Sequence, residues 1–118
     1  MSKPEVVTIG LRKCGGLKGM HGSIPEQGRI SYMSSVFQSL SDPIRLSIIF
    51  ALHVTPLCVC VMKSLFKIAD SKLSYHLDSL ESTGLISAKS EGRFIVYSIT
   101  ELGRTMLSAC KRAPVRSW

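Results

Sequence analysis

The sequence has no long apolar segment and few acidic side chains, and each shortage narrows the class of protein. The apolar run Ile48–Leu52 is five residues long, whereas a transmembrane helix needs about 20, so we expect no membrane span. The N-terminus lacks the continuous apolar core of a signal peptide, so we expect a cytoplasmic protein. Of the 118 residues, 8 are acidic and 15 are basic, which gives a net charge of +7.

Catalytic signatures are also missing. The chain contains no Ser-His-Asp, Cys-His-Asp or His-Glu-x-x-His pattern, and no glycine-rich phosphate loop that opens a helix. We therefore expect that the protein is not an enzyme. The length suits one domain with a modest core, and a composition of 45% hydrophobic and 19% charged residues is typical of a soluble globular chain.

The positive charge is concentrated at the two ends of the chain. Residues 1–31 carry five basic and two acidic side chains, residues 32–88 carry four of each, and residues 89–118 carry six basic and two acidic. A neutral centre between basic ends favours a domain that meets a polyanion through its extremities, although basic ends can also serve solubility alone.

The glycines are concentrated at the N-terminus, where residues 1–29 hold six of the nine. This density opposes regular structure, so we predict a flexible, glycine-rich basic arm over residues 1–29 and a folded domain over residues 30–118. Four cysteines in a cytoplasmic chain indicate metal-binding or reactive thiols more readily than a disulfide framework.

Apolar spacing and turn signals divide the folded domain into elements. The sequence predicts helices over residues 30–40, 43–53, 57–66 and 70–83, strands over 85–89 and 94–99 around a turn at 90–93, and a last helix after Thr100. Asp42, Thr100 and either Asp70 or Ser71 are the expected helix caps, and Gly84 is the expected helix stop. Closely joined helices followed by a hairpin predict a mainly α winged helix-turn-helix with a β-hairpin, in the order α-α-α-α-β-β-α.

Six segments between residues 37 and 100 resemble, in order, signatures of the ArsR/SmtB family of metal-sensing winged-helix repressors. They are LSDPIRL at residues 40–46, LCVC at 57–60, SYHLDSL at 74–80, GLI at 84–86, EGR at 91–93 and VY at 96–97. The resemblance implies that residues 30–118 form a winged-helix DNA-binding and dimerisation domain. It also implies a homodimeric repressor on double-stranded operator DNA, released by a metal ion.

Two departures from the family pattern concern metal ligands. Arsenic sensors often continue the cysteine box as C-V-C-D-L-C, whereas Val61 and Lys63 here replace the aspartate and the third cysteine. The zinc site that some members carry on the last helix is missing, because residues 100–118 contain no histidine and no aspartate.

The fourth predicted helix, residues 70–83, carries the expected DNA contacts. Short polar or basic side chains near the start of a recognition helix read base edges in the major groove. Ser71, Lys72, Ser74 and Tyr75 provide such groups. On the hairpin, Lys89 and Arg93 flank the turn and suit phosphate contact. His76 lies at the edge of the apolar stripe of the helix, so we interpret it as a packed, hydrogen-bonded side chain and not as a metal or DNA ligand.

The apolar faces of the first and last helices of the domain are the expected dimer surface. The residues concerned are Ile30, Met33, Phe37, Leu102, Met106 and Cys110. They could instead close the core of one chain, so the dimer depends mainly on the resemblance.

Cys58 and Cys60 are the expected metal-binding thiols. Two residues apart in mid-helix they would point in different directions, but at the first turn after Pro56 both sulfurs can face one point. The unpaired N–H groups of that turn favour thiolates. Thiolates select soft ions such as As(III), Sb(III), Cd(II), Pb(II) or Zn(II).

Two sulfurs leave such an ion incompletely coordinated. Cys14, His53 and Cys110 are the candidates for a further ligand. By resemblance to Cd(II) and Pb(II) sensors, whose arm cysteines reach the partner subunit's box, Cys14 is preferred. Cys110 is interpreted more simply as a buried, small apolar residue of the dimer face. Two alternatives remain open, namely a thiol-redox-sensing repressor of the same fold and a degenerate family member that binds DNA without sensing metal.

Overall fold

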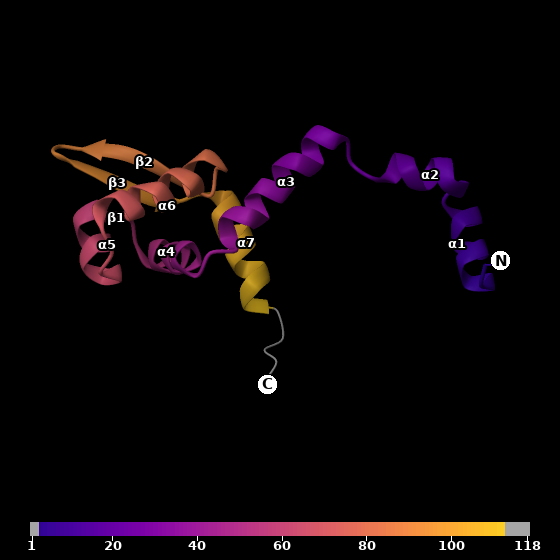
Figure 1. Cartoon of the computed structure of the whole chain (residues 1–118), viewed down its shortest axis with the longest axis horizontal. Helices are drawn as coiled ribbons and strands as arrows, with labels where there is room; N and C mark the ends of the chain where they lie inside the picture. The colour runs from indigo at the N-terminus through magenta and orange to yellow at the C-terminus, as the bar shows by residue number, and fades with distance from the viewer. Residues whose placement is uncertain (1–2, 113–118) are drawn as a thin grey trace. The chain divides into compact units, whose positions relative to one another are not determined.

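The computed structural model describes residues 3–112, so the last six residues of the expected domain over 30–118 lie outside the described part. The chain divides into two compact units, Met1–Met33 and Ser34–Trp118. Their helices and strands are labelled in Figure 1.

The N-terminal unit is helical, which corrects the expectation that its glycines oppose regular structure. It contains α1 (Glu5–Lys13) and α2 (Gly16–Ser23), joined through Gly15 in the left-handed conformation at φ 91°. Gly19 lies against the carbonyl of Cys14, where any Cβ would overlap the oxygen. The glycines here thus permit a tight turn and a close approach. Neither helix contains a buried residue, and the role of this segment as a flexible arm stays a prediction.

Two longer helices follow, α3 (Gln27–Leu40) and α4 (Pro43–Val54), as the sequence predicts. The Asp42 carboxylate between them accepts hydrogen bonds from the backbone N–H of Ile44 at 2.8 Å and of Arg45 at 3.3 Å. Asp42 is therefore the expected cap, and Pro43 occupies the first helical position, where its missing N–H costs nothing.

The cysteine box, residues 57–60, is not part of a single helix, which corrects the predicted helix over 57–66. Leu57 and Cys58 form a short strand, β1, and α5 (Val59–Phe66) begins one residue later. Pairing with a neighbouring strand, at Tyr97 and Val96, satisfies backbone groups that a first helical turn would leave free. Cys58 accordingly keeps an extended backbone, with φ −88° and ψ 164°.

The helix α6 (Asp70–Ser82) buries the predicted leucine stripe, because Leu73, Leu77 and Leu80 are each at most 1% exposed. The expected cap is wrong. The residue before the helix is Ala69, which has no side-chain cap, and Asp70 is already helical. The Asp70 carboxylate instead forms an ion pair with Lys63 of α5, so it links the two helices of the helix-turn-helix.

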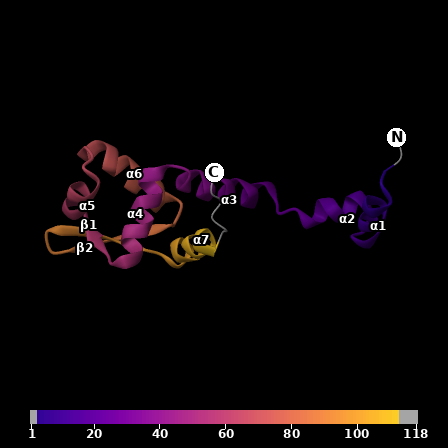
Figure 2. The ribbon, with the colours of Figure 1, turned by 90° about the horizontal axis from the view of Figure 1, so that it is seen from below.

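The predicted hairpin is present, and a third strand joins it. β2 (Ile86–Glu91) and β3 (Phe94–Ile99) pair antiparallel around Gly92 and Arg93, so the turn is shorter than the expected 90–93. β1 adds to the free edge of β3, with Cys58 opposite Val96, and the sheet order is β1-β3-β2. Figures 1 and 2 both show the end of the hairpin extending beyond the helices of its unit.

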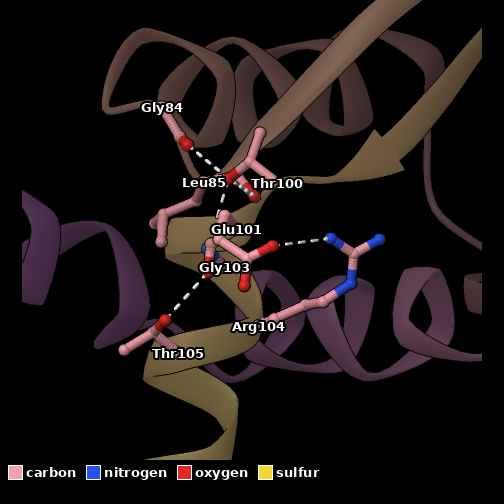
Figure 3. Close-up of polar contacts among 7 residues, drawn as sticks. All are labelled: Gly84, Leu85, Thr100, Glu101, Gly103, Arg104 and Thr105. Carbon is pink, nitrogen blue, oxygen red and sulfur yellow. Dashed lines mark hydrogen bonds and ion pairs between the residues drawn. The ribbon is translucent and has the colours of Figure 1, made fainter.

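The last helix, α7 (Glu101–Arg112), is fixed to the base of the hairpin by Thr100 (Figure 3). The Thr100 hydroxyl accepts from the N–H of Gly103 at 3.2 Å and lies 2.6 Å from the carbonyl oxygen of Gly84. It is the predicted cap. Gly103 lies so close to the hairpin that a Cβ there would be 2.5 Å from the carbonyl oxygen of Leu85.

One apolar core holds this unit together. It draws on α3, α4, α5, α6, α7 and the hairpin, and its members are Val36, Ile48, Ile49, Leu52, Met62, Leu73, Leu77, Leu80, Leu85, Ile86, Tyr97, Ile99 and Leu107. Within residues 3–112, no helix has the length and apolar character needed to cross a membrane. The predicted mainly helical fold with a β-hairpin is confirmed, and α1, α2 and β1 are additions to the predicted order.

Candidate nucleic-acid interface and thiol site

The outer face of α6 presents the side chains that the sequence assigns to DNA. Ser71, Lys72, Ser74 and Tyr75 are all exposed, because the helical period turns them away from the leucine stripe. Tyr75 is 63% exposed although it is a large aromatic residue. The first two turns of α6 thus offer hydroxyl, ammonium and phenol groups to a partner.

Arg45 is a residue of this region that the sequence analysis missed. Its Nε donates a hydrogen bond to Nδ1 of His76 at 3.1 Å, and its guanidinium carbon lies 5.3 Å from the centroid of the Tyr75 ring. A guanidinium at that distance attracts the ring face. Arg45 therefore connects α4 to both the buried and the exposed face of α6. The sequence feature that could have identified it is its position in the D-P-x-R segment, residues 42–45.

His76 is packed in the core, as predicted. It is 3% exposed, and its Nδ1 accepts the bond from Arg45. Its Nε2 is buried and has no hydrogen-bond partner among the described residues. A side chain so enclosed contributes to the position of α6 and is not available to DNA.

The hairpin of β2 and β3, residues 86–99, is the wing of the fold. It carries Lys89 and Arg93, both exposed. Lys89 lies 3.7 Å from the Glu91 carboxylate, an exposed ion pair of a kind that contributes little stability and leaves the ammonium accessible. Arg93 follows Gly92, whose positive φ of 61° forms the turn. The wing therefore presents basic groups on either side of its tip, on a different element from α6.

Cys58 and Cys60 lie side by side. Their Sγ atoms are 2.8 Å apart, with Cys58 in β1 and Cys60 in the first turn of α5. The prediction that both sulfurs face one point is confirmed, and the cause is the extended backbone of Cys58, which removes the angular separation of a regular helix.

The two thiols differ in acidity. The hydrogen bond shared with Cys60, with a further one from the N–H of Val61, holds the pKa of the Cys58 thiol below its usual value. The same hydrogen bond raises the pKa of the Cys60 thiol. The expectation of acidic thiols at the helix start thus holds for Cys58 and is wrong for Cys60.

The thiol pair opens into a cavity of about 350 Å³ between the start of α5 and the wing. Its lining residues are Pro56, Leu57, Cys58, Cys60, Val61, Glu91, Phe94 and Val96. Five of these eight side chains are apolar hydrocarbons and only one is charged. The two thiols and the wing, which carries Lys89 and Arg93, therefore line the same cavity.

The three candidate further ligands have different surroundings. Cys14 is partly buried, and its thiol donates to the carbonyl oxygen of Leu11 at 3.4 Å. His53 and Cys110 are exposed, so the expected burial of Cys110 is not present in the single chain. Across residues 3–112, no three His, Cys, Asp or Glu side chains are grouped so that they could hold a metal ion. Cys58 and Cys60 therefore form a two-sulfur site in the single chain.

Residues 42–88 match the family described as bacterial regulatory protein, arsR family. Over 69 residues the chain is 35% identical to a transcriptional repressor SmtB homolog of Synechocystis sp., covering 58% of this chain and 52% of that protein. Over 71 residues it is 34% identical to the cadmium resistance transcriptional regulatory protein CadC of Listeria innocua, covering 59% and 60%. The chain thus spans between half and two thirds of the length of these relatives.

Two further similarities extend over more of the compared protein. An HTH-type transcriptional regulator of Methanocaldococcus jannaschii is 30% identical over 69 residues, which cover 58% of this chain and 78% of that protein. A crystal structure of an ArsR family transcriptional regulator aligns with a TM-score of 0.59 and 26% identity, covering 68% of this chain and 88% of the other. Fold and family signatures together define a winged-helix regulator. The chain belongs to the ArsR family, whose members are regulatory proteins and not enzymes.

Proposed function

We propose that this protein is a homodimeric, metal- or metalloid-responsive transcriptional repressor, released from operator DNA when a soft ion binds the thiolates of Cys58 and Cys60. The observation that carries the proposal is the thiol pair, 2.8 Å apart at the start of α5. Because Cys58 pairs with Val96 of β3, the site belongs to the same sheet as the wing. A relative named for cadmium resistance supports a soft ion as the signal.

The DNA-binding surface consists of the outer face of α6 and the wing. Ser71, Lys72, Ser74 and Tyr75 enter the major groove, where their polar groups and the Tyr75 ring contact base edges, sugars and thymine methyls. Lys89 and Arg93 contact phosphates beside it, which positions the domain without reading sequence. All six side chains are exposed, so none must leave a packed site to reach DNA.

A second copy of the chain completes the regulator, because one recognition helix reads too short a site for specificity. The apolar side chains of α3 support this assembly, since Ile30, Met33 and Phe37 are 36%, 43% and 60% exposed. Leu102 and Met106 of α7 pack partly on the core and, together with the exposed Cys110, provide the second face of the dimer surface.

Cys58 and Cys60 would hold an As(III), Sb(III), Cd(II), Pb(II) or Zn(II) ion, and Cys14 of the partner subunit would supply a third sulfur. Soft ions prefer thiolate ligands, and the lowered pKa of Cys58 favours the thiolate form of that side chain. Allosteric coupling is typically about 1–3 kcal/mol, or 5- to 150-fold in affinity, which is sufficient for derepression.

The test is a DNA-binding titration with and without the ion. An operator is first selected from random duplexes with the reduced protein, and fluorescence anisotropy then follows release on addition of Cd(II) or arsenite. We expect the ion to weaken the DNA affinity of wild type about 5- to 150-fold. Cys58→Ser and Cys60→Ser should bind DNA with an affinity that the ion does not change, and Cys110→Ser should behave as wild type.

Other outcomes identify the alternatives. Release by an oxidant but by neither ion under reducing conditions would assign the thiols to redox sensing. DNA binding that neither treatment affects would indicate a regulator that does not sense ions. Failure to select any duplex would contradict the proposed function itself.

A further inference from the structure

A second cavity, of about 330 Å³, lies between α3, α4 and α6, within the compact unit that begins at Ser34. Its lining consists of four serines, one threonine, one tyrosine, one glutamine and one arginine. Every one of these side chains carries a polar group, in contrast to the apolar cavity beside the thiols. We call this cavity the polar notch. It offers hydrogen bonds to a ligand and little hydrophobic contact.

Arg45 is the only charged residue that lines the polar notch. Its Nε donates to His76 and its guanidinium lies 5.3 Å from the Tyr75 ring, so the group is held in place. The ion pairs of residues 3–112 are formed by other side chains, and the Asp42 carboxylate accepts from backbone N–H groups. The two Nη groups of Arg45 therefore keep an unneutralised charge and donors that no described residue engages.

The other groups of the polar notch favour a ligand that is rich in acceptor atoms. The Gln38 amide and the Tyr75 hydroxyl line it, and neither forms a hydrogen bond with another described residue. Phosphate oxygens accept bonds from such donors, and a guanidinium binds a phosphate through two parallel N–H groups. The serines add small side chains, which leave the space between α3 and α6 open. A phosphate group therefore fits both the charge and the donors.

The position of the polar notch indicates the source of the phosphate. Tyr75 lines the notch and also belongs to the exposed face of α6 that we assign to DNA. A single guanidinium binds a free phosphate ion weakly in water. A backbone phosphate is delivered by the other contacts of the same duplex, which raise its effective concentration at the notch. DNA is therefore the favoured source.

We propose that the polar notch binds one phosphate of the operator backbone, with the Arg45 guanidinium as the charged donor and the Gln38 amide beside it. The inference rests on the proposed DNA-binding function and extends its interface from α6 and the wing to α3 and α4. A phosphate contact carries no base information. Its role is to fix the register of α6 in the major groove.

The first test places a carboxylate in the polar notch without changing its shape. Gln38→Glu is isosteric and lies at an exposed position, so the fold should be retained, which circular dichroism verifies. We expect this full-length variant to bind every duplex about three- to tenfold more weakly, as loss of one net hydrogen bond implies. The salt slope of log K should fall by about one per chain. Gln27→Glu, at an exposed position of the same helix outside the notch, is the control of equal charge and should leave both values unchanged.

The second test locates the phosphate on the DNA. Each backbone phosphate of the selected operator is replaced in turn by an uncharged methylphosphonate, and affinities are measured by anisotropy. At one position per half-site, the replacement should weaken binding by wild type and Gln27→Glu about three- to tenfold. It should hardly affect Gln38→Glu, because that variant has already lost the contact. Ser82→Asp, which brings a carboxylate into the notch from an exposed position of α6, should remove the sensitivity at the same phosphate.

The outcomes separate this inference from the proposed function. Equal binding by Gln38→Glu and Gln27→Glu, or a methylphosphonate pattern that Gln38→Glu leaves unchanged, overturns the phosphate site while the response of the repressor to ions stands. Competition by sodium phosphate beyond that of sodium chloride at equal ionic strength, if Gln38→Glu abolishes it, overturns the assignment to DNA in favour of a free phosphate. The expected pattern in a protein whose DNA affinity neither Cd(II) nor arsenite changes supports the phosphate site, and only the proposed response to ions then fails.

Discussion

Arg45, Tyr75 and His76 show how single side chains prepare the exposed face of α6. His76 is enclosed and receives the hydrogen bond of Arg45 at 3.1 Å, while the same guanidinium lies 5.3 Å from the Tyr75 ring. The ring is thus restrained on one side and remains open on the other. A restrained contact residue loses less conformational entropy on binding than a freely rotating one.

The first prediction at this scale concerns base readout. Lys72→Ala and Tyr75→Ala should each weaken operator binding by roughly 1–3 kcal/mol if they touch bases, measured by anisotropy at fixed salt. Lys111→Ala, which removes an exposed lysine from α7, controls for net charge and should have a smaller effect. Unchanged binding by both α6 variants would exclude this helix from the readout.

The second prediction concerns the unequal thiols. The hydrogen bond between the two thiols lowers the pKa of Cys58 and raises the pKa of Cys60. Since the thiolate is the reactive form, iodoacetamide should modify Cys58 first at neutral pH, and Cys60 should gain reactivity only at higher pH. Fragment mass spectra at early times assign the site. Equal initial rates across the pH range would contradict the asymmetry.

At the scale of elements, the sequence analysis succeeded where one residue decides the local structure. Asp42 caps the start of α4, Thr100 caps the start of α7, and Gly84 follows the end of α6, each as expected. The leucine stripe of α6 was equally readable, because burial follows the helical period.

The sequence analysis failed where a residue distant in the sequence determines the local structure. Leu57 and Cys58 are strand residues only because the edge of β3, about 40 residues further on, is free to pair with them. The glycines of α1 and α2 permit a close approach that their density alone does not reveal. The role of Arg45 likewise depends on contacts to residues 30 and 31 positions away. Long-range packing, which local propensity does not encode, accounts for each of these misses.

The joint between α7 and the hairpin gives a prediction for the fold (Figure 3). Gly103→Ala should reduce the free energy of unfolding by about 1–3 kcal/mol, the usual cost of overpacking, because the added Cβ would lie 2.5 Å from the Leu85 carbonyl oxygen. Urea denaturation followed by circular dichroism measures it. Ser108→Ala, at an exposed position of the same helix, should stay within about 0.5 kcal/mol of wild type. Equal stabilities for the two variants would show that α7 can shift to accommodate the added Cβ without loss of stability.

The wing gives a second prediction for an element. Arg93→Ala should weaken binding to all duplexes alike and reduce the salt slope of log K by about one, because a phosphate contact carries no base information. Binding measured at several salt concentrations, on the selected operator and on a scrambled duplex, provides the test. Arg104→Ala is the control, since Arg104 lies 3.5 Å from Glu101 on α7. A loss confined to the operator would place Arg93 on a base.

At the scale of the whole molecule, the proposed function connects the thiol site to a second copy of the chain. An inorganic ion on Cys58 and Cys60 needs another donor, and Lys63 stands where the related arsenic sensors have their third cysteine. Fixing an arm costs roughly 1–2 kcal/mol per residue in entropy, whereas structural zinc–thiolate sites reach about 10–16 kcal/mol. Ion binding is therefore strong enough to order a segment such as the one that carries Cys14.

The last prediction follows from this balance. Cys14→Ser should keep operator binding, bind Cd(II) or arsenite more weakly and be released from DNA poorly by either. Ultraviolet absorption of the S–Cd(II) band and operator anisotropy are the measurements, with Cys110→Ser as the matched control. The arm is ruled out as the source of the third sulfur if Cys14→Ser responds like wild type while Cys110→Ser does not. The third ligand would then lie on α7, where Cys110 is exposed, and the dimer face itself would sense the ion.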